Sequence, residues 1–371
     1  MRRVHAASRR VSESPFAILG CGVGVTSSFR AFLVNDLFGD PVLYVGLPWE
    51  RRALLFDLGD IAGLSAGHLL KITDVFVSHT HIDHFIGFDH LLRVLLGRPK
   101  ALRIFGPPGM IAHVEGKLSG YTWNLVDSYT FSIEAFEVHP HAIVGARFSC
   151  PEHFRRHDDP VSHPFEGTIV ADANFRVRAT HLDHRVPCLA FSVEEPTHLN
   201  VDPDRLEKLG LPVGPWLMDV KRAIRRGEPE TYSIHVAWST DGQRRQRELS
   251  LGYLRHEVIR ESPGQKLAYV TDAASSPEND RKIIDLAHGA DLFYCEAGYP
   301  DRDAQRAADR FHLTARQAGR LAAAAQATHL SVFHLSPKYR DNPGEILAEA
   351  ADAFACGRGE ESAHLNLLSL S

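Results

Sequence analysis

Three histidines and one aspartate lie close together in the segment SHTHIDH, at His79, His81, Asp83 and His84. The segment follows an apolar run and precedes a helical pattern. Residues two apart on an extended chain point the same way, so His79 and His81 can bind one metal ion. Asp83 and His84 lie where the chain turns into the helix and can face a second ion. Histidine is frequent in this chain, with 22 among 371 residues. The spacing therefore favours a metal site over a capping turn of solvated histidines.

Other candidate ligands follow other predicted strands. His184 follows the run at 176–179, Asp272 the run at 266–270, and His334 the run at 330–333. Open α/β sheets place ligands at the carboxyl ends of their strands. His181 competes with His184 for its position, and the residues alone leave that choice open. Imidazole and carboxylate ligands without thiolate favour zinc, while manganese and iron also fit.

Such a site suits phosphodiester hydrolysis. Two divalent ions, balanced by Asp83, Asp272 and a bridging hydroxide, keep a net positive charge that attracts a phosphodiester anion. The ions also lower the pKa of bound water to about 7, which supplies hydroxide at neutral pH. Asp83 would hold and orient that hydroxide.

The elements that position these residues alternate between strands and helices. Four- to six-residue apolar runs bounded by polar or turn residues predict strands, at 16–19, 53–56, 74–77, 102–105, 176–179, 189–193, 266–270, 292–295 and 330–333. Apolar residues at helical spacing predict helices, at 85–96, 281–287, 314–327 and 344–354. Strands interspersed with helices predict an α/β layered fold.

Three stretches interrupt this alternation. We expect a disordered tail at 1–15, followed by one hydrolase domain at 16–371. Within that domain, a surface excursion is expected at about 142–167 and an arm-like insertion at about 196–264. The insertion contains LGLPVGPW and two groups of basic residues, at 221–226 and 244–247, which suit either a solvated face or phosphate contacts.

Composition excludes several classes of protein. Hydrophobic residues make up 44% and charged residues 23%, which is typical of a globular chain with a full core. The net charge of -5 argues against a broad electrostatic binder of nucleic acid. No apolar run is long enough for a membrane span. The five cysteines form no C-x-x-C pair, and residues 1–15 lack the apolar run of a secretory signal, so we expect a reducing, cytoplasmic location.

These blocks together resemble the metallo-β-lactamase superfamily, whose H-x-H-x-D-H motif opens a two-metal site, and within it the ribonuclease Z family. The resemblance runs in order from residue 16 to about 354. Beside SHTHIDH, its blocks are LFDLGD (55–60), LRIFGPPG (102–109), LDHRVPCLAF (182–191), LGLPVGP (209–215), CEAG (295–298), FHLTARQAG (311–319) and FHLSPKYR (333–340).

The resemblance implies a fold and a set of roles. The fold would be an αββα sandwich with a long inserted arm. Two zinc ions would be bound, one by His79, His81 and His184 and the other by Asp83, His84 and His334, with Asp272 bridging them. His312 with Glu296 would form the acid pair at the leaving group, and Asp60, in place of the family's glutamate, would be a carboxylate behind the ligands. Gly214, Pro215 and Lys221 belong to a segment similar to the Gly-Pro-rich arm that grips tRNA in the family. Arg222, Arg225 and Arg226 match no pattern of the family, and they join these three as candidate RNA contacts only because they lie in the same insertion. A homodimer is also implied.

We therefore expect an endoribonuclease that hydrolyses a phosphodiester at the 3′ side of precursor tRNA through a dinuclear zinc-bound hydroxide. Two alternatives stay open. A small-substrate hydrolase of the same fold, acting on a cyclic nucleotide, another phosphodiester, a lactone or a thioester, would share the ligands and differ only above the metals. A binding module would keep the metals for structure or RNA recognition, which the full set of ligands disfavours.

Overall fold

The computed structural model describes residues 29–47, 50–240 and 243–359, and the chain divides into two compact units. The first unit comprises the chain up to Ile169, Val177–Val193 and the chain from Lys266 onward. The second comprises Val170–Arg176 and Glu194–Gln265. The predicted tail at 1–15 and strand at 16–19 lie outside the described residues. No helix in the described ranges is long and apolar enough to cross a membrane.

One large sheet of the first unit carries the SHTHIDH segment. Its strands follow the order β1-β2-β3-β4-β5-β6-β7-β8, and β9 also pairs with β7. They are β1 (Arg30–Leu33), β2 (Leu43–Leu47), β3 (Arg52–Phe56), β4 (Ile72–Phe76), β5 (Ala101–Gly106), β6 (Ser132–Val138), β7 (Ala142–Ser149), β8 (His157–Asp158) and β9 (His163–Pro164). The strands from β3 to β6 are parallel, so their carboxyl ends meet at one edge of the sheet.

A second sheet carries the remaining predicted ligands. Its strand order is β10-β11-β12-β17-β18-β19. The strands are β10 (Thr168–Ala171), β11 (Arg176–Asp183), β12 (Pro187–Glu194), β17 (Lys266–Val270), β18 (Leu292–Glu296) and β19 (His329–Phe333). The last three are parallel, so Asp272, Glu296 and His334 all lie at the carboxyl edge.

The two sheets pack face to face through aromatic side chains. Phe56 of β3 and Phe76 of β4 lie 5.7 and 5.8 Å, between ring centroids, from Phe191 of β12. Phe56 also lies 5.9 Å from Tyr269 of β17. All four rings are buried, so this aromatic layer forms the core between the sheets.

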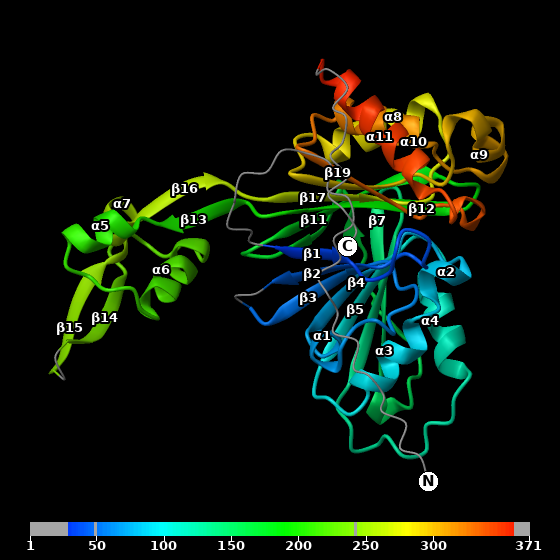
Figure 1. The fold of residues 1–371 in the computed structure, drawn as a ribbon. Coiled ribbons are helices and arrows are strands. Elements are labelled where there is room, and N and C mark those ends of the chain that lie inside the picture. Colours follow the sequence, from blue (N-terminus) through cyan, green and yellow to red (C-terminus); the bar gives the residue numbers. More distant parts are fainter. Residues whose placement is uncertain (1–28, 48–49, 241–242, 360–371) are drawn as a thin grey trace, which may run out of the picture. The chain divides into compact units, whose positions relative to one another are not determined.

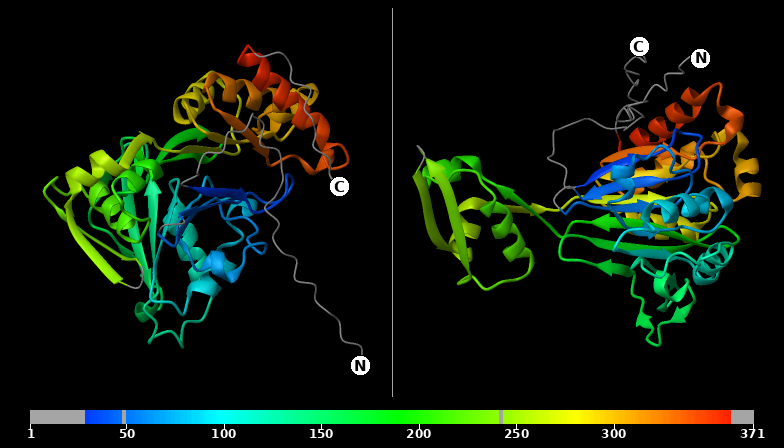
Figure 2. Two further views of the ribbon diagram at one scale, coloured as in Figure 1. Left: turned by 60° about the vertical axis from the view of Figure 1, so that its left-hand side comes forward. Right: turned by 90° about the horizontal axis from the view of Figure 1, so that it is seen from below.

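Helices cover the outer face of each sheet (Figure 1). Apolar residues of α3 and α4 pack on the first sheet, and those of α8, α10 and α11 pack on the second. The helices of this unit are α1 (Ala66–Leu69), α2 (Ile82–Phe85), α3 (Phe88–Leu95), α4 (Met110–Ser119), α8 (Pro277–Ala287), α9 (Ala304–Arg310), α10 (Ala315–Ala324) and α11 (Pro343–Gly357), with the 3-10 turns η1 (Cys150–Glu152), η2 (Asp301–Asp303) and η3 (Pro337–Tyr339). The further views in Figure 2 show the same four layers, which confirms the predicted αββα sandwich.

The second unit has its own hydrophobic core, which the sequence analysis did not foresee. It consists of the antiparallel pairs β13 (Thr197–Val201) with β16 (Ile259–Pro263) and β14 (Ser233–Thr240) with β15 (Gln243–Ser250), together with α5 (Pro203–Lys208), α6 (Trp216–Arg225) and α7 (Leu251–Val258). Trp216 and Val220 of α6 pack with Leu254 and Val258 of α7 in that core. The predicted arm-like insertion at 196–264 is therefore folded rather than loop-like.

The structure differs from the predicted excursion at 142–167. Residues 142–149 form β7, which pairs with β6 from Ile143 to Ser149. Ile143, Ala146 and Phe148 of this strand are buried, and Ala146 and Phe148 belong to the core of the first sheet and its helices. The histidines, arginines and prolines that suggested a loop belong mainly to the following residues, which form η1, β8 and β9.

The predicted helix at 85–96 is divided into α2 and α3 at Gly87. The Gly87 N–H donates to the Leu58 carbonyl over 2.9 Å, and the Leu58 N–H donates to the His84 carbonyl over the same distance. A Cβ atom on Gly87 would lie 2.2 Å from the Gly59 carbonyl oxygen. This close approach holds the turn after β3 against the helix that carries Asp83 and His84.

Gly87→Ala tests that contact. The added methyl group has no room beside Gly59, so the substitution should lower the free energy of unfolding by about 1–3 kcal/mol. Gly116→Ala is the control, because Gly116 lies in α4 and a Cβ atom added there would have nothing within 4 Å. The control should be neutral or stabilising. Urea unfolding followed by circular dichroism measures both, and equal stability of the two variants would refute the close packing.

Candidate metal centre

The end of β4 places four of the predicted ligands together. His79 and His81 lie on the extended segment after the strand, and α2 begins at Ile82 with His81 as its N-cap residue. Asp83 and His84 therefore lie in the first turn of the helix. His79 and His84 are buried, whereas His81 is exposed. The structure thus brings the four side chains to one edge of the first sheet.

The second sheet contributes three more predicted ligands, His184, Asp272 and His334, and histidine nitrogens from both sheets surround the Asp272 carboxylate. Asp272 Oδ2 lies 3.6 Å from His79 Nε2, 3.4 Å from His84 Nε2 and 3.5 Å from His184 Nε2. Asp272 Oδ1 lies 2.8 Å from His334 Nδ1. The two sheets therefore meet at a single buried carboxylate.

The ligand atoms fall into groups that suit two cations. His79, His81, His184 and Asp272 offer atoms within 4.8 Å of one another, as do Asp83, His84 and His334. His84 Nε2 and His334 Nδ1 are buried and make no hydrogen bond, although the Asp272 carboxylate is close to both. Buried imidazole nitrogens without a hydrogen bond are expected where a metal ion is the partner. The residues present therefore fit a dinuclear centre.

The pKa values in the metal-free site also fit a metal centre. Burial lowers the pKa of His79 to about 2, so its imidazole is neutral and able to bind a metal. Burial also opposes the charged form of His334, yet Asp272 raises the pKa of His334 to about 10. Without metal, protons thus supply part of the positive charge that Asp272 requires. A divalent ion would replace those protons.

Asp57 supports this site from behind, and sequence reasoning missed it. Its Oδ2 accepts hydrogen bonds from His84 Nδ1 and from the Tyr269 hydroxyl, each over 2.9 Å, and its Oδ1 accepts from the Ser78 N–H over 2.7 Å. The side chain is fully buried. Because His84 Nδ1 donates to Asp57, its Nε2 is free to bind a metal ion.

The expectation for Asp60 is wrong. Asp60 is exposed, and its Oδ1 accepts a hydrogen bond from the Ala62 N–H over 2.8 Å, within its own turn. Asp57 is the residue that directly follows β3, as Asp272 and His334 follow closely after their strands. Asp272 and His334 are predicted because ligands lie at the carboxyl ends of strands, and the same rule predicts Asp57.

Glu296 and His312 form the predicted pair. Glu296, the last residue of β18, is fully buried; its Oε1 accepts from the Ala273 N–H over 2.7 Å, and its Oε2 accepts from His312 Nδ1 over 2.8 Å. Burial opposes protonation of His312, but Glu296 raises its pKa above the ordinary value. The neighbouring Phe311 carbonyl accepts from His184 Nδ1 over 2.9 Å. One short segment before α10 thus orients both His184 and His312.

A cavity of about 410 Å³ opens over these residues. His81, Asp83, His184, Asp272, His312 and His334 line it. Phe38, Asp40, Tyr299 and Arg310 also line it, and none of these was predicted. Phe38 and Asp40 lie in the loop between β1 and β2, Tyr299 follows β18, and Arg310 ends α9. Their meeting depends on the packing of the whole unit, and no local motif marks them.

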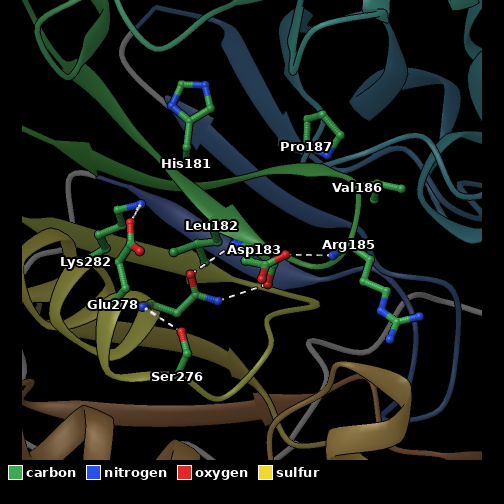
Figure 3. A pocket seen from close by; sticks show the side chains of 10 residues that line it. His181, Leu182, Asp183, Arg185, Val186, Pro187, Ser276, Glu278 and Lys282 are labelled. Carbon is green, nitrogen blue, oxygen red and sulfur yellow. Dashed lines mark hydrogen bonds and ion pairs between the residues drawn. The ribbon is translucent and has the colours of Figure 1, made fainter.

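His181 and His184 lie in different surroundings, and His181 lies at a second hollow, of about 330 Å³ (Figure 3). His181 lines this hollow and donates from Nε2 to the Val138 carbonyl over 2.9 Å. His184 instead belongs to the ligand groups. Arg185 and Lys282 also line the hollow, but Lys282 pairs with Glu278 over 2.8 Å and the Arg185 guanidinium lies over the Phe311 ring.

The six predicted RNA-contact residues all belong to the second unit. Gly214 and Pro215 directly precede α6, which carries Lys221, Arg222 and Arg225, and Arg226 follows it. Arg222 is exposed and lies 3.3 Å from Asp219. Arg225 pairs with the buried Glu195 over 2.9 Å, which gives it a structural task within that unit.

Comparison with known proteins gives close relatives over most of the chain. No family model matches it. A ribonuclease Z of Deinococcus radiodurans is 35% identical over 298 residues, which cover 80% of this chain and 86% of the relative. A ribonuclease Z of Kineococcus radiotolerans is 32% identical over 327 residues, covering 86% and 85%. The structure of human tRNase Z, short form, aligns with a TM-score of 0.46 at 18% identity, covering 87% of this chain and 93% of that one.

Asp57→Asn tests the support behind His84. Removing the charge weakens the acceptor that orients the imidazole, so the affinity for zinc should fall about 10- to 100-fold. Asp60→Asn is the matched control and should leave the affinity unchanged, because Asp60 is exposed within its own turn. Competition with a chromophoric zinc chelator measures both. An effect of Asp60→Asn as large as that of Asp57→Asn would contradict the assignment.

Proposed function

The chain belongs to the ribonuclease Z family, and we propose that it is a metal-dependent endoribonuclease that hydrolyses the phosphodiester at the 3′ side of precursor tRNA. The observation that carries this proposal is the gathering of seven imidazole and carboxylate side chains, with Asp272 among them, beneath an open cavity. The ligand types favour two zinc ions. Bound there, two ions would make hydroxide available near neutral pH and draw negative charge from the phosphorus oxygens.

Asp83 is placed to handle the nucleophile. Its Oδ2 lies 3.5 Å from His84 Nε2 and 3.4 Å from His334 Nε2, and about a third of the side chain, 34%, is exposed toward solvent. The carboxylate can therefore accept a hydrogen bond from the attacking water or hydroxide and orient it. His84 and His334 fix the orientation of that carboxylate.

His312 is placed to act on the leaving group. Its Nδ1 is engaged by Glu296, which leaves Nε2 as the nitrogen that can give a proton to the departing 3′ oxygen. Glu296 is held in turn by the Ala273 N–H, so the pair is rigid before substrate binds. A proton given to a poor leaving group, such as a ribose oxygen, removes the negative charge that would otherwise develop on it.

Incubation of the zinc-loaded protein with a precursor tRNA carrying a 3′ trailer tests the function. We expect cleavage at the trailer junction, at a rate that falls steeply with salt because RNA phosphate contacts release counterions. Hydrolysis of bis(p-nitrophenyl) phosphate should depend little on salt. Turnover of the small diester without any cleavage of the precursor would indicate a small-substrate hydrolase, and turnover of neither would indicate a binding module.

Arg222 and Arg226 serve as a probe of RNA binding in the same assay. Their joint replacement by alanine should raise KM for the precursor and reduce the salt dependence, since both are exposed. Arg225 is left unchanged because its pairing with Glu195 stabilises the second unit. The joint variant should still hydrolyse bis(p-nitrophenyl) phosphate at the wild-type rate.

His312→Ala separates chemistry from binding. Because p-nitrophenolate leaves without a proton, hydrolysis of bis(p-nitrophenyl) phosphate should survive within a few fold. Cleavage of the precursor should fall by about 10²- to 10⁴-fold, which is the usual contribution of general acid catalysis. Single-turnover rates give both values. Equal losses on the two substrates would show that His312 does not act as the acid.

A further inference from the structure

The loop between β1 and β2 borders the cavity over the metal centre. Phe38, Gly39 and Asp40 of this loop line the cavity together with His334 and Asp83. Leu37 is buried in the core of the second sheet and its helices, and Phe38 is only partly buried against that core. Phe38 therefore packs partly against protein and also lines the cavity in which substrate would lie.

Hydrogen bonds hold this loop close to the metal ligands. The Leu335 N–H donates to the Leu37 carbonyl over 2.8 Å, which ties the loop to the residue after His334. The Asn35 side-chain amide donates to the carbonyl of Asp40 over 2.5 Å and to that of Asp60 over 2.8 Å. The loop is thus attached to the segments that follow β19 and β3. Phe38 has a fixed place relative to the ligands on those segments.

The ring itself is supported by a cation. The Arg340 guanidinium lies 5.2 Å from the centroid of the Phe38 ring, within the range of a cation–π interaction. Tyr299 also lines the cavity, but its side chain is only 8% exposed, and so it offers little surface to a ligand. Phe38 is more exposed than Tyr299 and lines the same cavity as Asp83 and His334.

We propose that Phe38 is the platform on which a nucleobase next to the scissile phosphodiester stacks. The proposal rests on the function argued above and adds a residue that determines substrate class. An RNA chain whose phosphate lies on the metal centre must place a neighbouring base within this cavity, where Phe38 gives it an aromatic partner. Stacking on an aromatic ring accepts every base, because each has a π face. It would therefore favour nucleic acid over other phosphodiesters without selecting a sequence.

The test pairs a variant with a modified substrate. Phe38→Leu keeps an apolar side chain against the core but removes the ring, and Phe38→Trp keeps a ring. On precursor tRNA, Phe38→Leu should raise KM between about fivefold and a hundredfold, the range that base–aromatic stacking supports, with zinc content unchanged. Phe38→Trp should stay within a few fold of wild type. Tyr129→Leu, at an exposed aromatic residue outside the cavity lining, is the control and should have no effect.

The second half of the test uses precursors that carry one abasic nucleotide, directly before or directly after the cleaved bond. One of these two precursors lacks the base that stacks on Phe38. On that precursor, wild type and Phe38→Leu should have the same KM. If Phe38→Leu raises KM by the same factor on both abasic precursors and on the intact one, the ring has no base partner and the proposal is overturned. Failure of the proposed function is seen separately, as wild-type protein that does not cleave the intact precursor.

Discussion

A buried carboxylate surrounded by imidazoles is the interaction on which the rest of the structure depends. Asp272 is 2% exposed, and nitrogens of His79, His84, His184 and His334 lie between 2.8 and 3.6 Å from its oxygens. An isolated carboxylate in such a place is costly unless positive charge accompanies it. Because this carboxylate requires cations, residues from both sheets and from the loops at their edges converge on it. The same cations would supply the proposed chemistry.

The backbone is strained where these side chains are placed. Asp57, Asp272 and His334 have φ angles of 58, 35 and 57°, in the left-handed region that non-glycine residues rarely adopt. Phe311, whose carbonyl orients His184, has a φ of 61°. Such conformations cost on the order of 1–3 kcal/mol each and persist where the surroundings fix them. Each of these residues lies one or two positions after a strand or helix and turns a polar group toward the centre, so the strain accompanies the geometry of the site.

The sequence predicted the ligands better than their surroundings. His79, His81, Asp83 and His84 stand in one short motif, and His184, Asp272 and His334 each follow an apolar run, so local pattern and parallel strand order locate them. The resemblance points to Asp60, whereas the position directly after a strand points to Asp57, which is the residue that contacts His84. Among the other residues of the cavity, Phe38 comes from a loop and Arg310 ends α9, and their meeting depends on the packing of the whole unit. The second unit falls within the predicted arm-like insertion, where the glycines and prolines of LGLPVGP obscure the apolar spacing of α6 and α7.

The number of metal ions per chain shows directly whether Asp272 joins two cations. Inductively coupled plasma mass spectrometry on zinc-reconstituted protein, freed of loosely bound ions, should find about two ions per chain in the wild type and markedly fewer in Asp272→Ala. Circular dichroism should show that the variant is folded. Less than one ion in active wild-type protein, or two ions retained by Asp272→Ala, would contradict the account.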